Sequence, residues 1–168
     1  EDIKKLPAQI IGINLILSYI AEPVFASEFS CIPMKVVTCM RISDDLQQNI
    51  SSFYGEILRV KMIVDKVKEG EKVFFLLDEI FKGTNSADRH TAAKTIIHNL
   101  DKYGAIGLVS THDLELDVLE KETQGKVLNY HFEEHYEEEK IIFDYKLKEG
   151  VSTTRNAIYL IKAAGIDL

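Results

Sequence analysis

The feature that most constrains this fold is a run of apolar residues, 73–77, that ends directly in two acids, Asp78 and Glu79. A run without polar alternation is typical of a strand buried on both faces, as in a parallel sheet covered by helices. Residues 105–110 form a second such run, and a helical pattern beginning near Ala87 separates the two. This order predicts an α/β fold in which ligand-binding groups lie at the carboxyl ends of the strands.

Apolar spacing predicts the other elements. We expect Ser86 or Asp88 to cap the helix near Ala87. Its buried face would carry Ala93, Ile96, Ile97 and Leu100. Further helices are expected over 10–20, 53–70 and 156–164, and strands over 34–40, 127–136 and 141–147. The helix that begins at residue 53 would bury Phe53, Ile57, Val60 and Val64. The last two strands read as an antiparallel pair, and we expect residues 1–168 to form a single domain.

Composition narrows the functional classes. The net charge is −7, whereas a domain that grips duplex DNA by its phosphates is usually basic. No apolar run is long enough to span a membrane, and the first residues show no signal-peptide pattern. Cys31 and Cys39 are the only thiols, and we expect two reduced, buried thiols rather than a disulfide, in a cytoplasmic protein. Because the chain does not begin with Met, we expect it to be part of a longer protein.

The acids at the end of the first buried strand match the Walker B arrangement. Asp78 would hold Mg²⁺, directly or through water. Glu79 would orient and polarise an attacking water as general base. Acids also follow strands as plain turn or cap residues. This pair alone therefore does not distinguish a Walker B site from a structural role.

His112 follows the second buried strand, after Ser110 and Thr111. An imidazole there can donate a hydrogen bond to a γ-phosphate or to the attacking water, as the switch histidine of ABC-type ATPases does. A lone histidine after a strand is more often structural. Its expected position beside Asp78 and Glu79 favours the functional interpretation.

The segment between these strands makes a family resemblance specific. Residues 78–84 (DEIFKGT), then Asp88, then residues 110–112 (STH) resemble the MutS family pattern of a DEI-x-[RK]-G-T segment followed by a T-H switch. Asp88 falls at the position of the family's D-loop acid, which approaches the partner subunit's nucleotide. The resemblance implies ATP and Mg²⁺ as cofactors, with Thr111 beside the nucleotide.

Upstream residues extend the resemblance. Residues 43–46 (SDDL), residues 51–53 (SSF) and Glu56 are similar to the family's D-D-L…S-[ST]-F-x-x-E segment, which serves as the ABC signature. A helix beginning near Ser51 would direct free backbone N–H groups at the γ-phosphate bound by the opposite subunit. The resemblance therefore implies Ser51 and Ser52 as nucleotide contacts made in trans. Ser51 as an ordinary N-cap would need the same geometry.

Residues 127–131, 143–150 and 163–166 also resemble the family's C-terminal strands and closing helix. The implied fold is a P-loop NTPase-like, ABC ATPase type, three-layer α/β domain with a mostly parallel core sheet and antiparallel C-terminal strands. The implied function is ATP binding and hydrolysis in a homodimer of a DNA mismatch-repair protein, with DNA bound by other domains. Two alternatives stay open: a MutS-related protein that controls recombination, and a non-catalytic dimerisation module.

One expected element is absent from the sequence. The family's phosphate-binding loop, G-x-x-x-x-G-K-[ST], cradles the β- and γ-phosphates through backbone N–H groups and a lysine. Its place, before the helix that resembles the corresponding helix of the family, is taken by residues 6–9 (LPAQ). Either the loop has been lost, which leaves a pseudo-ATPase, or it is omitted from this sequence near Gln9 and Ile10. The retained acids and His112 favour omission.

Residues 131–135 match the H-x-x-E-H pattern of a zinc peptidase class. The pattern requires a helix, whereas the polar and apolar residues around His131 alternate as in a strand. Histidines four residues apart in a strand lie about 13 Å from each other, too far for one zinc ion. We therefore expect a solvated hairpin here and no metal site.

Overall fold

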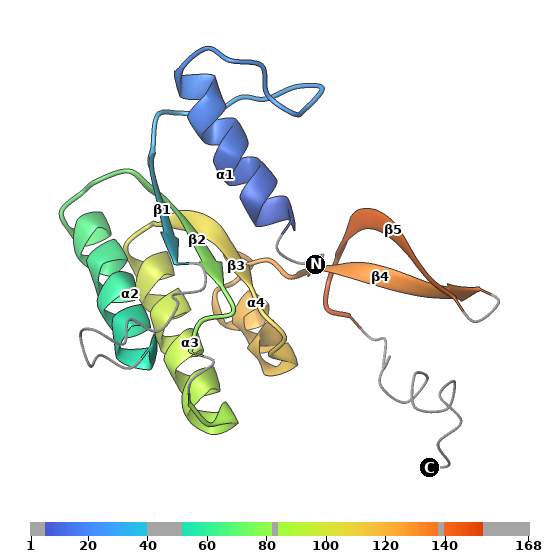
Figure 1. Ribbon diagram of the computed structural model, residues 1–168. Helices are drawn as coiled ribbons and strands as arrows, with labels where there is room; N and C mark the ends of the chain where they lie inside the picture. The colour runs from blue at the N-terminus through green and yellow to red at the C-terminus, as the bar shows by residue number, and fades with distance from the viewer. Residues whose placement is uncertain (1–5, 40–51, 82–83, 138–139, 153–168) are drawn as a thin grey trace. The chain divides into compact units, whose positions relative to one another are not determined.

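The computed structural model describes residues 6–39, 52–81, 84–137 and 140–152 (Figure 1). Their contacts divide the chain into two compact units, with the boundary between Val127 and Leu128. The helices of the first unit are α1 (Leu6–Tyr19), α2 (Ser52–Lys68), α3 (Ser86–Lys102), η2 (Leu114–Asp117) and α4 (Val118–Glu122). Its strands are β1 (Lys35–Cys39), β2 (Val73–Asp78) and β3 (Ile106–Ser110). The second unit contains β4 (Tyr130–Glu137) and β5 (Lys140–Glu149).

The sheet of the first unit confirms the predicted parallel core. Three strands pair in the order β1-β2-β3, and both pairings are parallel. All six residues of β2 are buried, because neighbouring strands cover its edges and helices cover its faces. This explains the apolar run without alternation.

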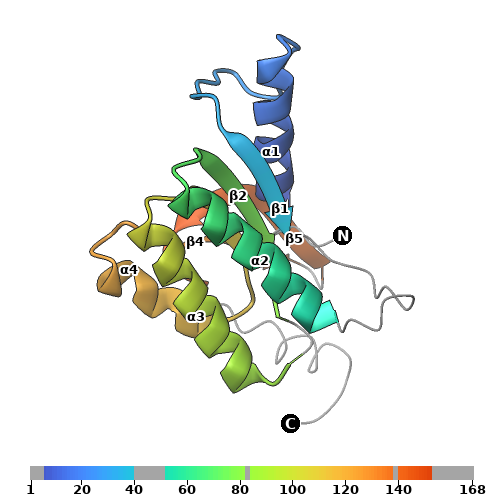
Figure 2. The ribbon, with the colours of Figure 1, turned by 90° about the vertical axis from the view of Figure 1, so that its left-hand side faces the viewer.

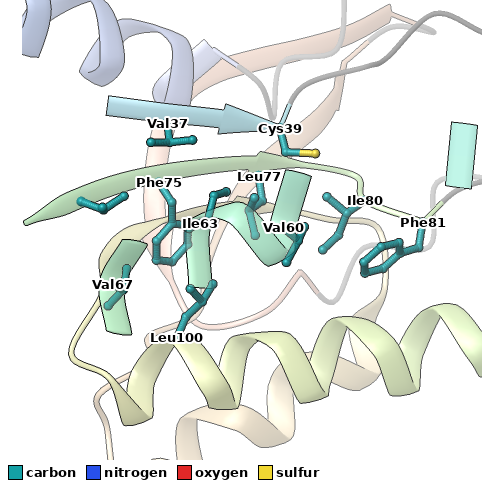
Figure 3. Packing of buried hydrophobic residues seen from close by; sticks show 11 residues of the cluster. Val37, Cys39, Val60, Ile63, Val67, Phe75, Leu77, Ile80, Phe81 and Leu100 are labelled. Atoms are coloured by element: carbon teal, nitrogen blue, oxygen red, sulfur yellow. The ribbon is translucent and has the colours of Figure 1, made fainter. Parts of the chain in front are cut away.

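Helices on both faces of this sheet make three layers (Figure 2). Phe74 and Leu76 of β2 pack with Ala8 and Leu15 of α1. Alternate residues of β2 point to the other face, where they join α2 and α3 (Figure 3). That second cluster comprises Val37, Cys39, Val60, Ile63, Val67, Val73, Phe75, Leu77, Ile80, Phe81 and Leu100.

Gly12 allows α1 to approach the sheet closely. A Cβ atom at this position would lie 2.6 Å from Cδ1 of the buried Leu76. The glycine that interrupts the apolar sequence of α1 is therefore a packing position. The helix runs without a break through Gln9 and Ile10.

The helix α2 ends as the sequence predicts. The N–H of Glu71 donates to the carbonyl oxygen of Lys66 at 3.1 Å, and that of Gly70 donates to Val67 at 3.0 Å. Gly70 has φ of 84°, and the two hydrogen bonds together with this conformation form a Schellman motif. One expectation for the apolar face of α2 is wrong: Ile57 is 37% exposed, while Ile63 is fully buried.

The start of α3 corrects a second prediction. Asn85, rather than Ser86 or Asp88, is the N-cap. Its backbone is extended (φ −65°, ψ 162°), and its Oδ1 accepts from the N–H of Asp88 at 2.9 Å. Ser86 is already the first helical residue, and Asp88 supplies the N–H that the cap satisfies. The prediction of the buried face of α3 is confirmed, since Ala93, Ile97 and Leu100 are buried.

The strand β3 is less buried than predicted. It lies at one edge of the three-stranded sheet, and Ile106 is 56% exposed.

The two cysteines differ from the expectation of two buried thiols, because Cys31 is exposed while Cys39 is buried. Neither cysteine forms a disulfide.

In the second unit, β4 and β5 form the predicted antiparallel pair, with a register shift between Phe132 and Glu134. Residues 131–135 thus lie on a strand, as the alternation indicates, and Nδ1–H of His131 donates to the carbonyl oxygen of Gly150 at 3.0 Å. The predicted helix over 156–164 falls outside the described residues. Across the described part of the chain, no helix has the length and apolar character needed to cross a membrane.

Candidate nucleotide site

The candidate site is built where β2 and β3 end. Asp78 is the last residue of β2, and it pairs in register with Ser110, the last residue of β3. The Ser110 hydroxyl donates to Oδ1 of Asp78. The N–H of Glu79 continues the ladder by donating to the carbonyl oxygen of Ser110 at 2.9 Å. The parallel register therefore determines which side chains meet at this edge.

Glu79 and His112 lie in direct contact. Nε2 of His112 contacts Oε1 of Glu79. The Glu79 side chain is only 7% exposed, whereas the His112 side chain is 58% exposed. Asp78, Glu79 and His112 thus share one edge of the sheet, as the strand order predicts.

The turn after β2 holds Glu79 in an unusual backbone conformation. Glu79 and Phe81 have positive φ values of 44° and 67°, which cost energy for any residue with a Cβ. Such conformations persist when the surroundings determine them strongly. Here two residues in the first turns of α2 contact Phe81, one through a hydrogen bond and one through ring packing. Glu56 accepts from its backbone N–H, and Phe53 packs edge-on against its ring at 5.6 Å between centroids.

The loop after β3 is organised around Asp113. Its N–H donates to Oγ1 of Thr111 at 3.0 Å, and its Oδ1 accepts from the N–H of Glu115 at 3.0 Å to cap η2. Its Oδ2 lies 3.0 Å from Nδ1 of His90 on α3. These hydrogen bonds restrain the backbone on both sides of His112.

The other residues predicted for the site are placed as follows. Asp88 is exposed in the first turn of α3, and its carboxylate accepts from Nδ2 of Asn85 at 2.6 Å. The Thr111 hydroxyl accepts from the loop backbone, as above. Ser52 is the first residue of α2. Ser51 lies outside the described residues.

Sequence reasoning gave no structural role to four residues that shape this region: Ser110, Glu56, His90 and Asp113. The pairing of Ser110 with Asp78 follows from aligning the two apolar runs as neighbouring parallel strands. No local pattern reveals the other contacts, because each joins residues on different elements.

The residues fit one half of a magnesium–nucleotide site. Asp78 and the Ser110 hydroxyl offer oxygen atoms, which Mg²⁺ prefers, and Glu79 and His112 lie beside them. The phosphate-cradling half does not fit. Residues 6–9 form the first turn of α1 and contain neither glycine nor lysine. The described residues thus bring carboxylates, a hydroxyl and an imidazole to this edge, and they contain no glycine-rich loop before α1.

Comparison with known protein families identifies the class of domain to which this fold and these motifs belong. The chain matches the family described as MutS domain V over residues 8–167, and it belongs to the MutS family. It is 35% identical to the DNA mismatch repair protein MutS of Aquifex pyrophilus over 132 residues, which is 78% of this chain and 15% of that protein. It is 34% identical over 133 residues to the protein of the same name from Halalkalibacterium halodurans, covering 79% and 15%. The chain thus spans about 15% of the length of these relatives.

Proposed function

We propose that this chain is the ATP-binding and ATP-hydrolysing domain of a MutS-like DNA mismatch-repair protein. The nucleotide state of a homodimer would control the binding of mismatched or branched DNA by other domains of a longer, cytoplasmic protein. One observation carries the proposal: Asp78, Glu79 and His112 lie at a common edge of a parallel sheet. Strand ends of this kind are where α/β folds bind ligands.

Each residue at the edge has a proposed part in hydrolysis. Asp78 holds Mg²⁺. Glu79 accepts a proton from the water whose oxygen bonds to the γ-phosphorus, as the bond to the β–γ bridging oxygen breaks and ADP leaves. His112 donates a hydrogen bond from its ring to the γ-phosphate or to this water.

Four further residues are proposed to contact the nucleotide. Thr111 acts within the same subunit. Ser52 is the first residue of α2, and Ser51 precedes it in the sequence. Both would meet the γ-phosphate of the opposite subunit, because the free N–H groups of a helix N-terminus favour an anion. Asp88 would approach the same opposite site from α3. Each of the two sites would thus be completed by the partner.

Substitution of the proposed base tests this function. In the complete protein, we expect Glu79→Gln to keep the Kd for Mg-ATP within about threefold and to lower turnover about 10²- to 10⁴-fold, the usual contribution of a positioned base. The surface change Glu69→Gln, near the end of α2, is the matched control and should leave both values unchanged. Unaltered steady-state hydrolysis in Glu79→Gln would falsify the assignment of the base.

A non-catalytic dimerisation module is a second candidate. It is favoured by the missing G-x-x-x-x-G-K-[ST] segment and by the unbroken course of α1 through Gln9 and Ile10. The ATPase proposal requires that the natural sequence carry this segment before the Ile10 region. Titration of Mg-ATP into the complete protein separates the two, because tight binding excludes the module.

A role in recombination control differs from mismatch repair only in the DNA substrate. Gel-shift titrations of the complete protein with mismatched duplex and with a four-way junction separate these roles. We expect tighter binding to the mismatch, and a strong preference for the junction would favour recombination control.

A further inference from the structure

A histidine outside the proposed reaction centre reaches the loop that carries His112. His90 lies on α3, just beyond the first turn, and its Nδ1 is 3.0 Å from Oδ2 of Asp113. Both side chains are largely buried, with 23% and 13% exposure. The contact therefore joins α3 to the residue that directly follows His112.

Asp113 is suited to transmit this contact to the loop backbone. Its second carboxylate oxygen caps η2, and its own N–H bonds to Thr111, on the other side of His112. These bonds restrict the backbone on both sides of His112. A shift of Asp113 would consequently change where the imidazole of His112 lies against Glu79.

We propose that His90 is a positioning residue that, through Asp113, holds His112 in contact with Glu79. The inference rests on the proposed function, since it concerns the ATPase reaction of the same site. The hydrogen bonds of Asp113 with Thr111 and Glu115 are local, whereas its contact with His90 joins the loop to another helix. His112 is the exposed member of its pair with Glu79. Rate in such a site depends on placement to within about 1 Å.

Two other interpretations compete with this one. The pair could act only in stability, as a second histidine on α3 does: Nε2 of His98 lies 2.9 Å from Oε2 of Glu122. Alternatively, His90, Asp113 and Glu115 could bind a metal ion, because their donor atoms lie within 4.8 Å of one another. The direct bond between His90 and Asp113 and the 82% exposure of Glu115 favour positioning.

The test compares two histidines of the same helix in the complete protein. We expect His90→Ala to lower kcat for Mg-ATP hydrolysis about tenfold or more while KM stays within twofold. His98→Ala, which also removes a bond to a carboxylate, should leave both values within twofold. His90→Asn should recover most of kcat, because its amide nitrogen can occupy the place of Nδ1. A double substitution with Asp113→Ala should be no slower than Asp113→Ala alone.

Each contrary result has a distinct meaning. Absence of hydrolysis by the unaltered protein would overturn the proposed function and the positioning role with it. Hydrolysis in which His90→Ala and His98→Ala behave alike would overturn the positioning role only. Stoichiometric zinc binding by the unaltered protein that is lost in His90→Ala would replace it with a metal site.

Discussion

At the scale of single residues, Phe81 decides whether the turn that carries Glu79 keeps its shape. Its ring is fully buried and packs against Phe53, and its N–H is bound by Glu56. The positive φ at Phe81 is unfavourable for a residue with a Cβ. The packing of the ring and the partly buried hydrogen bond offset that cost.

We expect Phe81→Ala to lower the free energy of unfolding by about 3–5 kcal/mol, the usual cost of truncating a buried aromatic. Urea denaturation followed by circular dichroism measures the change. Phe25→Ala is the control, because Phe25 is 84% exposed, and we expect its effect to stay within about 0.5 kcal/mol. Equal losses in the two variants would contradict the role assigned to Phe81.

The two thiols differ in chemical environment. Burial raises the pKa of the Cys39 thiol to about 11, with a smaller contribution from the charge of Glu56 and an opposing one from Arg59. Because the thiolate is the reactive form, Cys39 stays protonated and inert near neutral pH. The exposed Cys31 has no such protection by burial.

Alkylation with iodoacetamide at pH 8 is therefore expected to modify Cys31 first and Cys39 only after denaturation, as peptide mass spectrometry would reveal. The raised pKa has a second consequence. The pKa of the thiol is near 9.0 in the unfolded chain and about 11 in the folded chain. The protonated thiol therefore contributes fully to the free energy of unfolding below about pH 9, and this contribution is lost as the pH rises toward about 11. Rapid labelling of Cys39 in the folded protein would contradict its burial.

At the scale of elements, α3 connects β2 to β3, the two strands whose ends carry the candidate site. It begins directly after the turn that follows β2, and it carries Asp88 and His90 near its start. The cap at Asn85 therefore sets where both side chains lie. Its amide nitrogen also bonds the Asp88 carboxylate, so the cap and the proposed D-loop acid form one unit.

Removing this cap gives a further prediction. Asn85→Ala should destabilise the fold by about 0.5–2 kcal/mol, because the N–H of Asp88 loses its acceptor. The control is Asn99→Ala on the same helix, whose amide donates to the carbonyl oxygen of Thr95. This exposed bond within the helix should matter less. Thermal unfolding of both variants provides the comparison, and a larger loss in Asn99→Ala would argue against the cap.

At the scale of the whole molecule, the chain consists of two compact units with a boundary after Val127. The three clusters of buried apolar residues formed by the described residues lie within the first unit. The second unit contains the antiparallel pair β4 and β5. The expectation of a single domain remains a prediction, and cooperativity of unfolding is the property that tests it.

We expect a chain shortened to end at Val127 to unfold cooperatively in urea, because it retains every described apolar cluster. The transition should be sigmoidal when followed by circular dichroism. The same transition in the 168-residue chain is the reference. A broad, non-cooperative loss of signal in the shortened chain would show that the first unit depends on residues beyond the boundary.

The amino-acid sequence alone predicted the α/β class of the fold and the sheet edge at which Asp78, Glu79 and His112 meet. The physical reason is local, since a strand buried on both faces requires an uninterrupted apolar run. Parallel neighbours then place their carboxyl ends together. The antiparallel pair and the strand at residues 131–135 follow from the same side-chain periodicity.

The way in which the acids and the imidazole are held depends on contacts that form only in the folded chain. The Glu56–Phe81 and His90–Asp113 contacts join residues far apart in the sequence, so no local pattern signals them. Local pattern also failed to predict the exposure of Ile57, which lies on the apolar stripe of α2 yet is 37% exposed. Periodicity selects the inward face of a helix, whereas the packed neighbours decide how much of that face leaves water.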